Sequence, residues 1–185
     1  MTSSKAAKAV TEIPQGCIAF VAAGSGGHIQ SALAVLEHLS GRYPEITKKS
    51  VFVGSNLNME GEVKKVSLEE SLCQRMGIPF VKMRSGKFQR QFALSTLRLL
   101  GGVILGFIDA WKFFSQHKPK LIVSFGGYSS LPMGIVAWLR GVKLIIHEQT
   151  TSVGLTNRIL MKIADVSAIS YKQSEPFLNE LKMSL

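Results

Sequence analysis

Acidic residues are scarce in this sequence. Its 185 residues include 12 Asp and Glu against 22 Lys and Arg, which gives a net charge of +10. An excess of this size favours anionic partners, such as nucleic acid, anionic lipid or phosphorylated molecules. The sequence contains no nucleic-acid-binding motif, so charge is the only argument for nucleic acid. We therefore expect an anionic lipid surface or a phosphorylated ligand, and no nucleic acid.

Cysteine is also rare, with only Cys17 and Cys73 in the chain. The two residues fall in a predicted strand and a predicted helix, and their spacing does not fit a metal site. Both are expected to be reduced core residues of a cytosolic protein. We predict neither a bound metal nor a cofactor.

Long hydrophobic runs are missing as well. Leu99–Ile108 is an uncharged run of ten residues, which is too short to span a membrane as a helix. Residues 1–16, MTSSKAAKAVTEIPQG, contain no apolar segment of the kind that a secretory signal requires, and we expect a flexible lead-in there. The chain is 46% hydrophobic, so residues 17–185 are expected to form one domain with its own core.

The chain is organised around Cys17–Ser40. Cys17–Ala23 predicts a strand, a glycine-rich turn follows, and His28–Leu39 has the apolar spacing of a helix. A turn of this kind presents backbone N–H groups at a helix N-terminus, where phosphate groups bind. The glycine spacing fits neither the dinucleotide-binding fingerprint nor the P-loop.

His28 is the unusual residue of this segment, and it has two interpretations. At the start of a helix the peptide dipole disfavours the protonated imidazole, which suits a neutral base. The same position also suits a helix-capping histidine packed on the sheet. The residues around His28 leave both interpretations open.

Further strands and helices alternate along the rest of the chain. This alternation predicts an α/β fold, with a doubly wound, mainly parallel, Rossmann-like sheet. The first helix is expected to end at Gly41 and Pro44. The later strands are predicted at 49–54, 78–83, 120–125, 142–146 and 166–170. The later helices are predicted at 67–76, 92–114, 133–139, 155–164 and 174–185, with a possible break at Gly101-Gly102.

Three polar segments directly follow predicted strands: Gly24–His28, Gly126–Ser130 and His147–Thr150. The carboxyl ends of parallel strands share one edge of an open sheet, and ligands bind at that edge. Two of the segments are rich in glycine and two contain a histidine. We therefore predict one ligand site built from all three.

The helix predicted at 92–114 is apolar around most of its circumference and follows a basic loop. A buried core helix explains this composition, because surface helices have a narrower apolar stripe. An exposed apolar patch with a basic rim, in contact with a membrane surface, explains it too. The basic loop favours the second interpretation, in which Lys87, Phe88, Arg90 and Phe92 contact the membrane.

Four motifs give the sequence a resemblance to the MurG family of glycosyltransferases. The segments that resemble the family's motifs are AAGSGGHI at 22–29, GKFQR at 86–90, FGGYSSLP at 125–132 and HEQTTSVGLTNR at 147–158. They occur in the family's order, and the resemblance covers about residues 18 to 170. It implies the N-terminal domain of a GT-B enzyme, a fold of two Rossmann-like domains that face a cleft.

The resemblance also implies a reaction. Members of the family transfer GlcNAc from UDP-GlcNAc to the lipid-linked acceptor lipid I in peptidoglycan synthesis, with inversion and without a metal. The N-terminal domain holds the acceptor at the cytoplasmic face of the cell membrane, and the C-terminal domain holds most of the donor. His28 corresponds to the proposed base, which deprotonates the acceptor's C4 hydroxyl.

Other positions are implied to bind substrate or membrane. The substrate-binding positions are Ser25, Gly26, Gly27, Gly126, Gly127, Tyr128, Ser129, His147, Glu148, Gln149, Thr150 and Asn157. Trp138 falls where the family places an aromatic residue near its membrane patch.

The sequence departs from the family in two respects. Thr150 replaces an asparagine that contacts the donor, and a threonine lacks the paired donor and acceptor of an amide. The donor-binding domain is absent from the 185 residues, so we expect no turnover without one. The chain is therefore expected to be the acceptor-binding half of a glycosyltransferase. The alternative is a non-catalytic, membrane-associated subunit that binds polyprenyl-pyrophosphate lipid.

Overall fold

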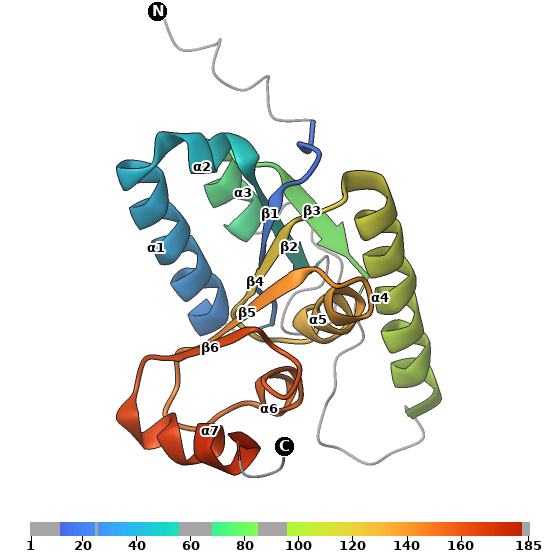
Figure 1. The fold of residues 1–185 in the computed structure, drawn as a ribbon. Helices are drawn as coiled ribbons and strands as arrows, with labels where there is room; N and C mark the ends of the chain where they lie inside the picture. Colours follow the sequence, from blue (N-terminus) through green and yellow to red (C-terminus); the bar gives the residue numbers. More distant parts are fainter. Residues whose placement is uncertain (1–11, 25, 56–67, 85–95, 183–185) are drawn as a thin grey trace, which may run out of the picture.

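A computed structural model describes residues 12–24, 26–55, 68–84 and 96–182 (Figure 1). Six parallel strands form one sheet in the order β3-β2-β1-β4-β5-β6. The strands are β1 (Ile18–Val21), β2 (Ser50–Ser55), β3 (Phe80–Met83), β4 (Leu121–Ser124), β5 (Lys143–Glu148) and β6 (Val166–Ile169). The helices are α1 (Gly26–Arg42), α2 (Pro44–Lys49), α3 (Leu68–Arg75), α4 (Thr96–His117), α5 (Ser130–Leu139), α6 (Leu155–Leu160) and α7 (Glu175–Lys182), with a 3-10 turn η1 (Lys172–Ser174) before α7.

This strand order confirms the predicted doubly wound, Rossmann-like sheet. The chain runs outward from β1 to β3 and then returns to add β4, β5 and β6 on the other side of β1. The strand order therefore reverses between β1 and β4, and ligands of open α/β sheets bind at the carboxyl ends of the strands beside such a reversal. The two glycine-rich turns follow these two strands.

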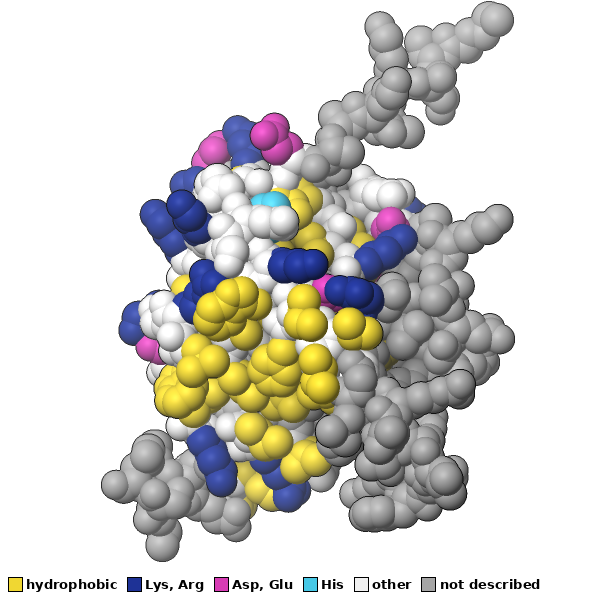
Figure 2. All heavy atoms as spheres, turned by 90° about the vertical axis from the view of Figure 1, so that its right-hand side faces the viewer, with side chains coloured by type: hydrophobic (Ala, Val, Ile, Leu, Met, Phe, Trp, Pro, Cys, Tyr) yellow, Lys and Arg dark blue, Asp and Glu magenta, His cyan; other side chains and the backbone are white. Residues whose placement is uncertain are grey.

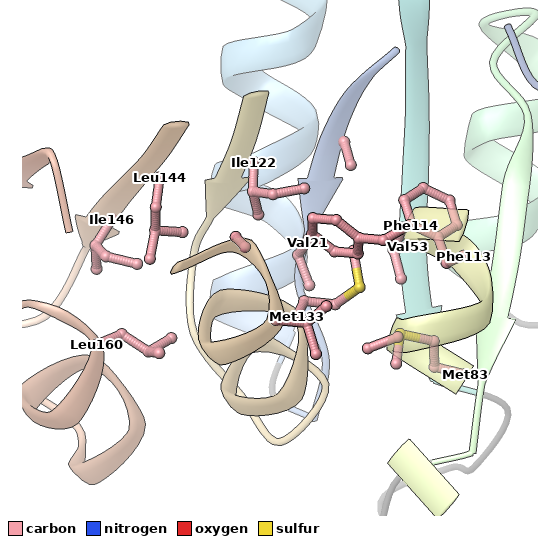
Figure 3. Close-up of a cluster of buried hydrophobic side chains, with 14 of the residues drawn as sticks. Val21, Val53, Met83, Phe113, Phe114, Ile122, Met133, Leu144, Ile146 and Leu160 are labelled. Atoms are coloured by element: carbon pink, nitrogen blue, oxygen red, sulfur yellow. The ribbon is translucent and has the colours of Figure 1, made fainter. Parts of the chain in front are cut away.

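Helices cover both faces of the sheet, and each face has its own core (Figure 1). Alternate residues of β1 point to opposite faces, so Val21 packs in one core and Phe20 in the other. Figure 3 shows the first core, where Phe114 of α4 and Met133 of α5 lie against the strands. Each large apolar side chain buried in this way contributes roughly 1.5–3 kcal/mol. The two cores hold the strand ends, and hence the turns that follow them, in place.

The structure corrects three details of the sequence prediction. Gly41 and Pro44 do not simply end a helical segment, because Pro44 begins the short helix α2, where its fixed φ and missing N–H are tolerated. Helix α4 runs without a break through Gly101-Gly102. Strand β5 extends through His147 and Glu148, so the third polar segment begins inside the strand.

Both cysteines are buried and free, as predicted. Burial raises the pKa of the Cys17 thiol to about 11. Burial, with smaller contributions from Glu69 and Glu70, raises the pKa of Cys73 to about 12. Neither thiol is therefore ionised near neutral pH.

Within the described ranges, no helix combines the length and apolarity needed to cross a bilayer.

Candidate functional site

The first glycine turn joins β1 to α1. Gly24 adopts a positive φ of 93°, and Gly26 and Gly27 form the exposed start of α1. The first N–H groups of a helix have no partner within the helix, and they carry its positive dipole end. This end of α1 can therefore bind an anionic group. Ser25, the remaining residue of the turn, lies outside the described residues.

The second glycine turn lies directly against the first. The Ala23 N–H donates to the Gly126 carbonyl at 3.4 Å, and the Ser130 hydroxyl donates to the same oxygen at 2.8 Å. Gly127 has a φ of +88°, and a Cβ placed there would lie 1.8 Å from the Ala23 carbonyl oxygen. Only glycine fits this close approach, so the two turns form one continuous backbone surface.

Tyr128 and Ser129 complete the second turn. A Cβ at Gly24 would lie 2.9 Å from the Tyr128 ring, so this ring covers the first turn. Ser129 is fully buried at the start of α5. Tyr128 is therefore the member of this pair that reaches the surface of the site.

The third polar segment is organised by a buried carboxylate. Glu148 is 1% exposed, and its oxygens accept hydrogen bonds from Thr150, Gly154 and Asn157. Burial alone would raise the pKa of Glu148, but these hydrogen bonds outweigh it and hold the pKa below its usual range. Glu148 is thus an ionised internal anchor for the loop that follows β5, although the resemblance implied a substrate contact.

Thr150 has its hydroxyl turned toward this anchor. Its backbone N–H and its hydroxyl both donate to the same oxygen of Glu148, at 3.0 and 2.6 Å. The Thr150 carbonyl accepts a hydrogen bond of 2.8 Å from the buried Ser174. The side chain that replaces the family's asparagine therefore stabilises the loop.

Asn157 brings this loop against the two glycine turns. Its side chain is 1% exposed, and its amide donates to Glu148 at 3.0 Å. A Cβ at Gly126 would lie 3.2 Å from the Asn157 amide nitrogen and 3.1 Å from Cε1 of His28. The three predicted polar segments therefore converge around Gly126.

His28 lies in the first turn of α1 and is half-buried. Its Nδ1 is in hydrogen-bonding contact with the side-chain amide nitrogen of Gln149. Gln149 directly follows β5, so this contact joins the first polar segment to the third.

His147 faces a different partner from His28. Its ring packs against Phe125, with 5.2 Å between the ring centroids, and its Nε2 lies 3.0 Å from the Ser170 hydroxyl. Burial lowers the pKa of His147, and the nearby Glu148 carboxylate offsets part of this effect. Sequence reasoning missed Ser170, although it ends a predicted strand and therefore belongs to the same sheet edge.

The predicted site residues that the structure describes thus lie along one carboxyl edge. They are Gly26, Gly27, His28, Gly126, Gly127, Tyr128, Ser129, His147, Glu148, Gln149, Thr150 and Asn157. The described part of the chain contains no cluster of three or more His, Cys, Asp or Glu that could hold a metal ion. The chemistry available at this edge is backbone N–H donation, one histidine at a helix start and a set of fixed polar side chains.

An exposed apolar surface covers the outer side of α4 and the end of α5, which we call the α4–α5 patch. It consists of Ile104, Leu105, Ile108 and Trp111 of α4 with Trp138 and Leu139 of α5. Figure 2 shows hydrophobic side chains gathered on this face with Lys and Arg side chains around them. The opposite side of α4 is buried in the core through Phe113 and Phe114, so the helix is packed in the core on one side and exposed and apolar on the other.

Basic side chains are fixed at the border of the α4–α5 patch. The Arg84 guanidinium donates to Asp109 at 3.0 Å, and the Arg140 guanidinium lies 4.2 Å from the centre of the Trp111 ring. Trp138 is 55% exposed, as a residue that contacts a membrane requires. Lys87, Phe88, Arg90 and Phe92, which we predicted to touch the membrane, lie outside the described residues.

Comparison with known proteins identifies relatives of the chain. It is 29% identical over 166 residues to a Bacillus cereus protein named UDP-N-acetylglucosamine--N-acetylmuramyl-(pentapeptide) pyrophosphoryl-undecaprenol N-acetylglucosamine transferase 2, with 90% of the chain and 44% of the relative aligned. It is 30% identical over 162 residues to the transferase of Myxococcus xanthus, covering 88% of the chain and 39% of the relative. The chain therefore spans less than half the length of these curated relatives.

Two solved structures share the fold of the chain. The crystal structure of Acinetobacter baumannii MurG aligns with 86% of the chain and 43% of its own length, at a TM-score of 0.64 and 25% identity. UDP-N-acetylglucosamine 2-epimerase from Rickettsia bellii aligns with 90% of the chain and 42% of its own length, at a TM-score of 0.58. The sequence identity of the epimerase to the chain is 13%, so this comparison shows the shared fold alone.

One family match spans the whole sheet. The family described as the glycosyltransferase family 28 N-terminal domain matches residues 18–169, from the start of β1 to the end of β6. The resemblance to the MurG family is thereby confirmed. The chain belongs to the glycosyltransferase family 28 N-terminal domains.

Proposed function

We propose that this chain is the acceptor-binding half of a glycosyltransferase that moves GlcNAc from UDP-GlcNAc to lipid I. The observation that carries the proposal is the convergence of His28, the two glycine turns and the Glu148-anchored loop around Gly126. Membership of a glycosyltransferase family supports the reaction class. The names of the aligned transferases support the donor and the acceptor.

In this proposal His28 is the general base. It accepts the proton of the acceptor's C4 hydroxyl while that oxygen forms a bond to the anomeric carbon of GlcNAc. The bond from that carbon to the diphosphate breaks, UDP leaves with its electron pair, and the anomeric centre inverts. The exposed N-terminus of α1 beside Gly26 and Gly27 would stabilise a diphosphate, through either the donor or the lipid-linked acceptor.

Transfer requires a donor-binding half. The chain spans 44% of its Bacillus cereus relative, and a bound nucleotide sugar is usually enclosed on most sides. We propose that residues 17–185 form the acceptor-binding domain. The donor-binding domain would lie elsewhere in the same polypeptide or in a separate chain.

The α4–α5 patch supports placement on the cytoplasmic face of the cell membrane. Its apolar side chains would enter the lipid boundary, and basic residues beside it would face anionic head groups, each contributing about 1 kcal/mol. The acceptor's lipid tail would then remain in the membrane while its sugar reaches the edge of the sheet. The same patch also favours the second candidate function, a non-catalytic subunit that holds polyprenyl-pyrophosphate lipid.

Radiolabelled GlcNAc transfer to a lipid I analogue tests the proposal. We expect no transfer by the 185-residue chain alone and measurable transfer once a donor-binding domain from a relative is supplied. Transfer by the chain alone would contradict the need for a second half. Lipid binding without transfer in any combination would establish the non-catalytic alternative.

His28→Ala tests the base within the reconstituted enzyme. A general base contributes about 10²–10⁴-fold, so we expect a loss of transfer in this range with an unchanged circular dichroism spectrum. His38→Ala, at an exposed position further along α1, is the control. Activity of His28→Ala within a few-fold of wild type would make His28 a helix-capping residue.

A further inference from the structure

We propose that Gln149 is a positioning residue that sets the tautomer of His28. In this proposal the Gln149 carbonyl oxygen accepts a hydrogen bond from Nδ1–H of His28, which leaves the imidazole lone pair on Nε2. The inference rests on the proposed role of His28 as a base. It gives Gln149 a role toward His28 in place of the substrate contact that the resemblance implies.

The first observation is the contact itself. Gln149 and His28 are 121 positions apart in the chain, yet the end of the Gln149 amide lies against Nδ1 of His28. The edge of the ring at Cε1 lies beside Gly126. Nε2, which follows Cε1 around the ring, is therefore the nitrogen turned away from Gln149.

The second observation concerns the two ends of the Gln149 amide. They have nearly the same size, so the amide occupies the same space in either orientation, and hydrogen bonding decides between them. With the nitrogen toward the ring, Nδ1 must be an acceptor and the ring proton lies on Nε2. With the oxygen toward the ring, Nδ1 carries the proton and Nε2 becomes the basic atom. Only the second arrangement suits a base that acts through Nε2.

The third observation is an excess of buried acceptors at this edge. With the nitrogen toward the ring, Oε1 of Gln149 is buried without a hydrogen-bond partner among the described residues, and so is Oδ1 of Asn157. Turning the amide gives the Gln149 oxygen a donor in Nδ1–H of His28. The NH₂ group then occupies the buried position of Oε1 and needs an acceptor there, and Oδ1 of Asn157 is one acceptor at this edge without a partner among the described residues. A buried polar group without a partner is costly, and the turned amide removes that cost from the Gln149 oxygen.

The backbone on both sides of Gln149 is fixed. Glu148 precedes it as the last residue of β5, and the Thr150 N–H that follows it donates back to Glu148 at 3.0 Å. Thr150 is held in turn by Ser174. Because the backbone of this turn is already ordered, the Gln149 side chain can orient His28 with little further loss of conformational entropy. A positioning residue requires such a support.

NMR of the ¹⁵N-histidine-labelled 185-residue chain tests the proposal without any substrate. Long-range ¹H–¹⁵N spectra above the titration range of imidazole report which ring nitrogen carries the proton, and His28→Ala assigns the His28 signals. We expect the proton on Nδ1 in the wild-type chain. A proton on Nε2 would overturn the proposal.

Variants at position 149 separate tautomer control from a purely structural role. Gln149→Leu should move the His28 proton toward Nε2, the more common site in free histidine. Gln149→Glu, which offers only acceptor oxygens, should retain it on Nδ1. Gln74→Leu, at an exposed position of α3, is the matched control and should leave the His28 signals unchanged. A wild-type spectrum for Gln149→Leu would overturn the proposal.

Transfer kinetics in the reconstituted enzyme then connect the tautomer to the reaction. Gln149→Leu should lower kcat and leave KM nearly unchanged. The loss in kcat should be smaller than that of His28→Ala, for which we expect about 10²–10⁴-fold. Gln149→Glu should recover most of that loss. If His28→Ala retains activity while the wild-type proton lies on Nδ1, the proposed base is wrong and the positioning role of Gln149 stands.

Discussion

The carboxylate of Glu148 accepts a hydrogen bond of 3.0 Å from the side-chain amide of Asn157, and each of these two side chains is 1% exposed. A buried charge of this kind is stable only when every oxygen is hydrogen-bonded. Here Thr150 and Gly154 provide the remaining donors. The pair links the end of β5 to the start of α6, so it determines the shape of the loop that faces His28.

Glu148→Gln should destabilise the fold near neutral pH. The amide would turn an NH₂ group toward existing donors, and each buried polar group left without a partner costs about 1–3 kcal/mol. Urea unfolding at pH 7 measures the loss. Glu37→Gln, at an exposed position of α1, is the control and should change the stability by less than about 0.5 kcal/mol.

The stability of Glu148→Gln should approach that of the wild type in acid. The pKa of Glu148 is lower in the folded state than in the unfolded chain, so the ionised carboxylate stabilises the fold fully above the unfolded value of about 4.3. That contribution decreases as the pH falls below this value and through the folded pKa. The difference in unfolding free energy between wild type and Glu148→Gln should therefore be smaller near pH 3 than at pH 7. A constant difference would contradict an ionised Glu148.

Gly127→Ala should be among the most damaging single substitutions in the chain. The added Cβ would lie 1.8 Å from the Ala23 carbonyl oxygen, and the φ of +88° disfavours any L side chain. Together these effects are expected to cost about 3 kcal/mol or more. Gly154→Ala is the matched control, because a Cβ there meets nothing within 4 Å and φ is −66°. Thermal melting compares the two, and equal melting temperatures would contradict the close approach of the two glycine turns.

The positions of the site residues could be predicted from the sequence because a parallel sheet gathers its carboxyl ends. Apolar runs identified the strands, and the glycine turns after β1 and β4 then had to meet. The side-chain roles after β5 could not be predicted, because His147 and Glu148 were placed beyond the strand. Once β5 extends through Glu148, its alternation places Glu148 on the buried side with Leu144 and Ile146.

Two details of the helices differ from the sequence prediction, each for its own reason. Glycine costs about 1 kcal/mol in a helix interior, so Gly101-Gly102 suggested a break. The burial of Ala110, Phe113 and Phe114 and the packing of α4 against α5 outweigh that local preference. Helix α2 was missed because proline is common both just after a helix and in its first turn, and Pro44 satisfies the second rule.

His147→Gln should flatten the pH dependence of stability below about pH 6.5. Burial lowers the pKa of His147 in the folded state, so the unfolded chain binds a proton more readily and stability falls as the pH decreases through this range. His117 has the same direction of shift and will retain part of the slope. Denaturant unfolding between pH 7.5 and 5 measures the change. An unchanged slope would show that His147 ionises equally in both states.

The α4–α5 patch should determine binding to anionic vesicles. Ile104 and Ile108 are four residues apart on one side of α4 and are 55% and 41% exposed. Replacing both with serine removes apolar surface worth on the order of 1 kcal/mol at each position, because only about half of each side chain is available to the lipid. Since 1.4 kcal/mol is a factor of ten, vesicle sedimentation should show roughly ten- to thirtyfold weaker binding.

Leu155→Ser/Ile159→Ser is the matched control, since these residues of α6 have the same spacing and are 65% and 40% exposed. Equal loss for both double variants would mean that exposed apolar area alone, and not the α4–α5 patch, determines binding.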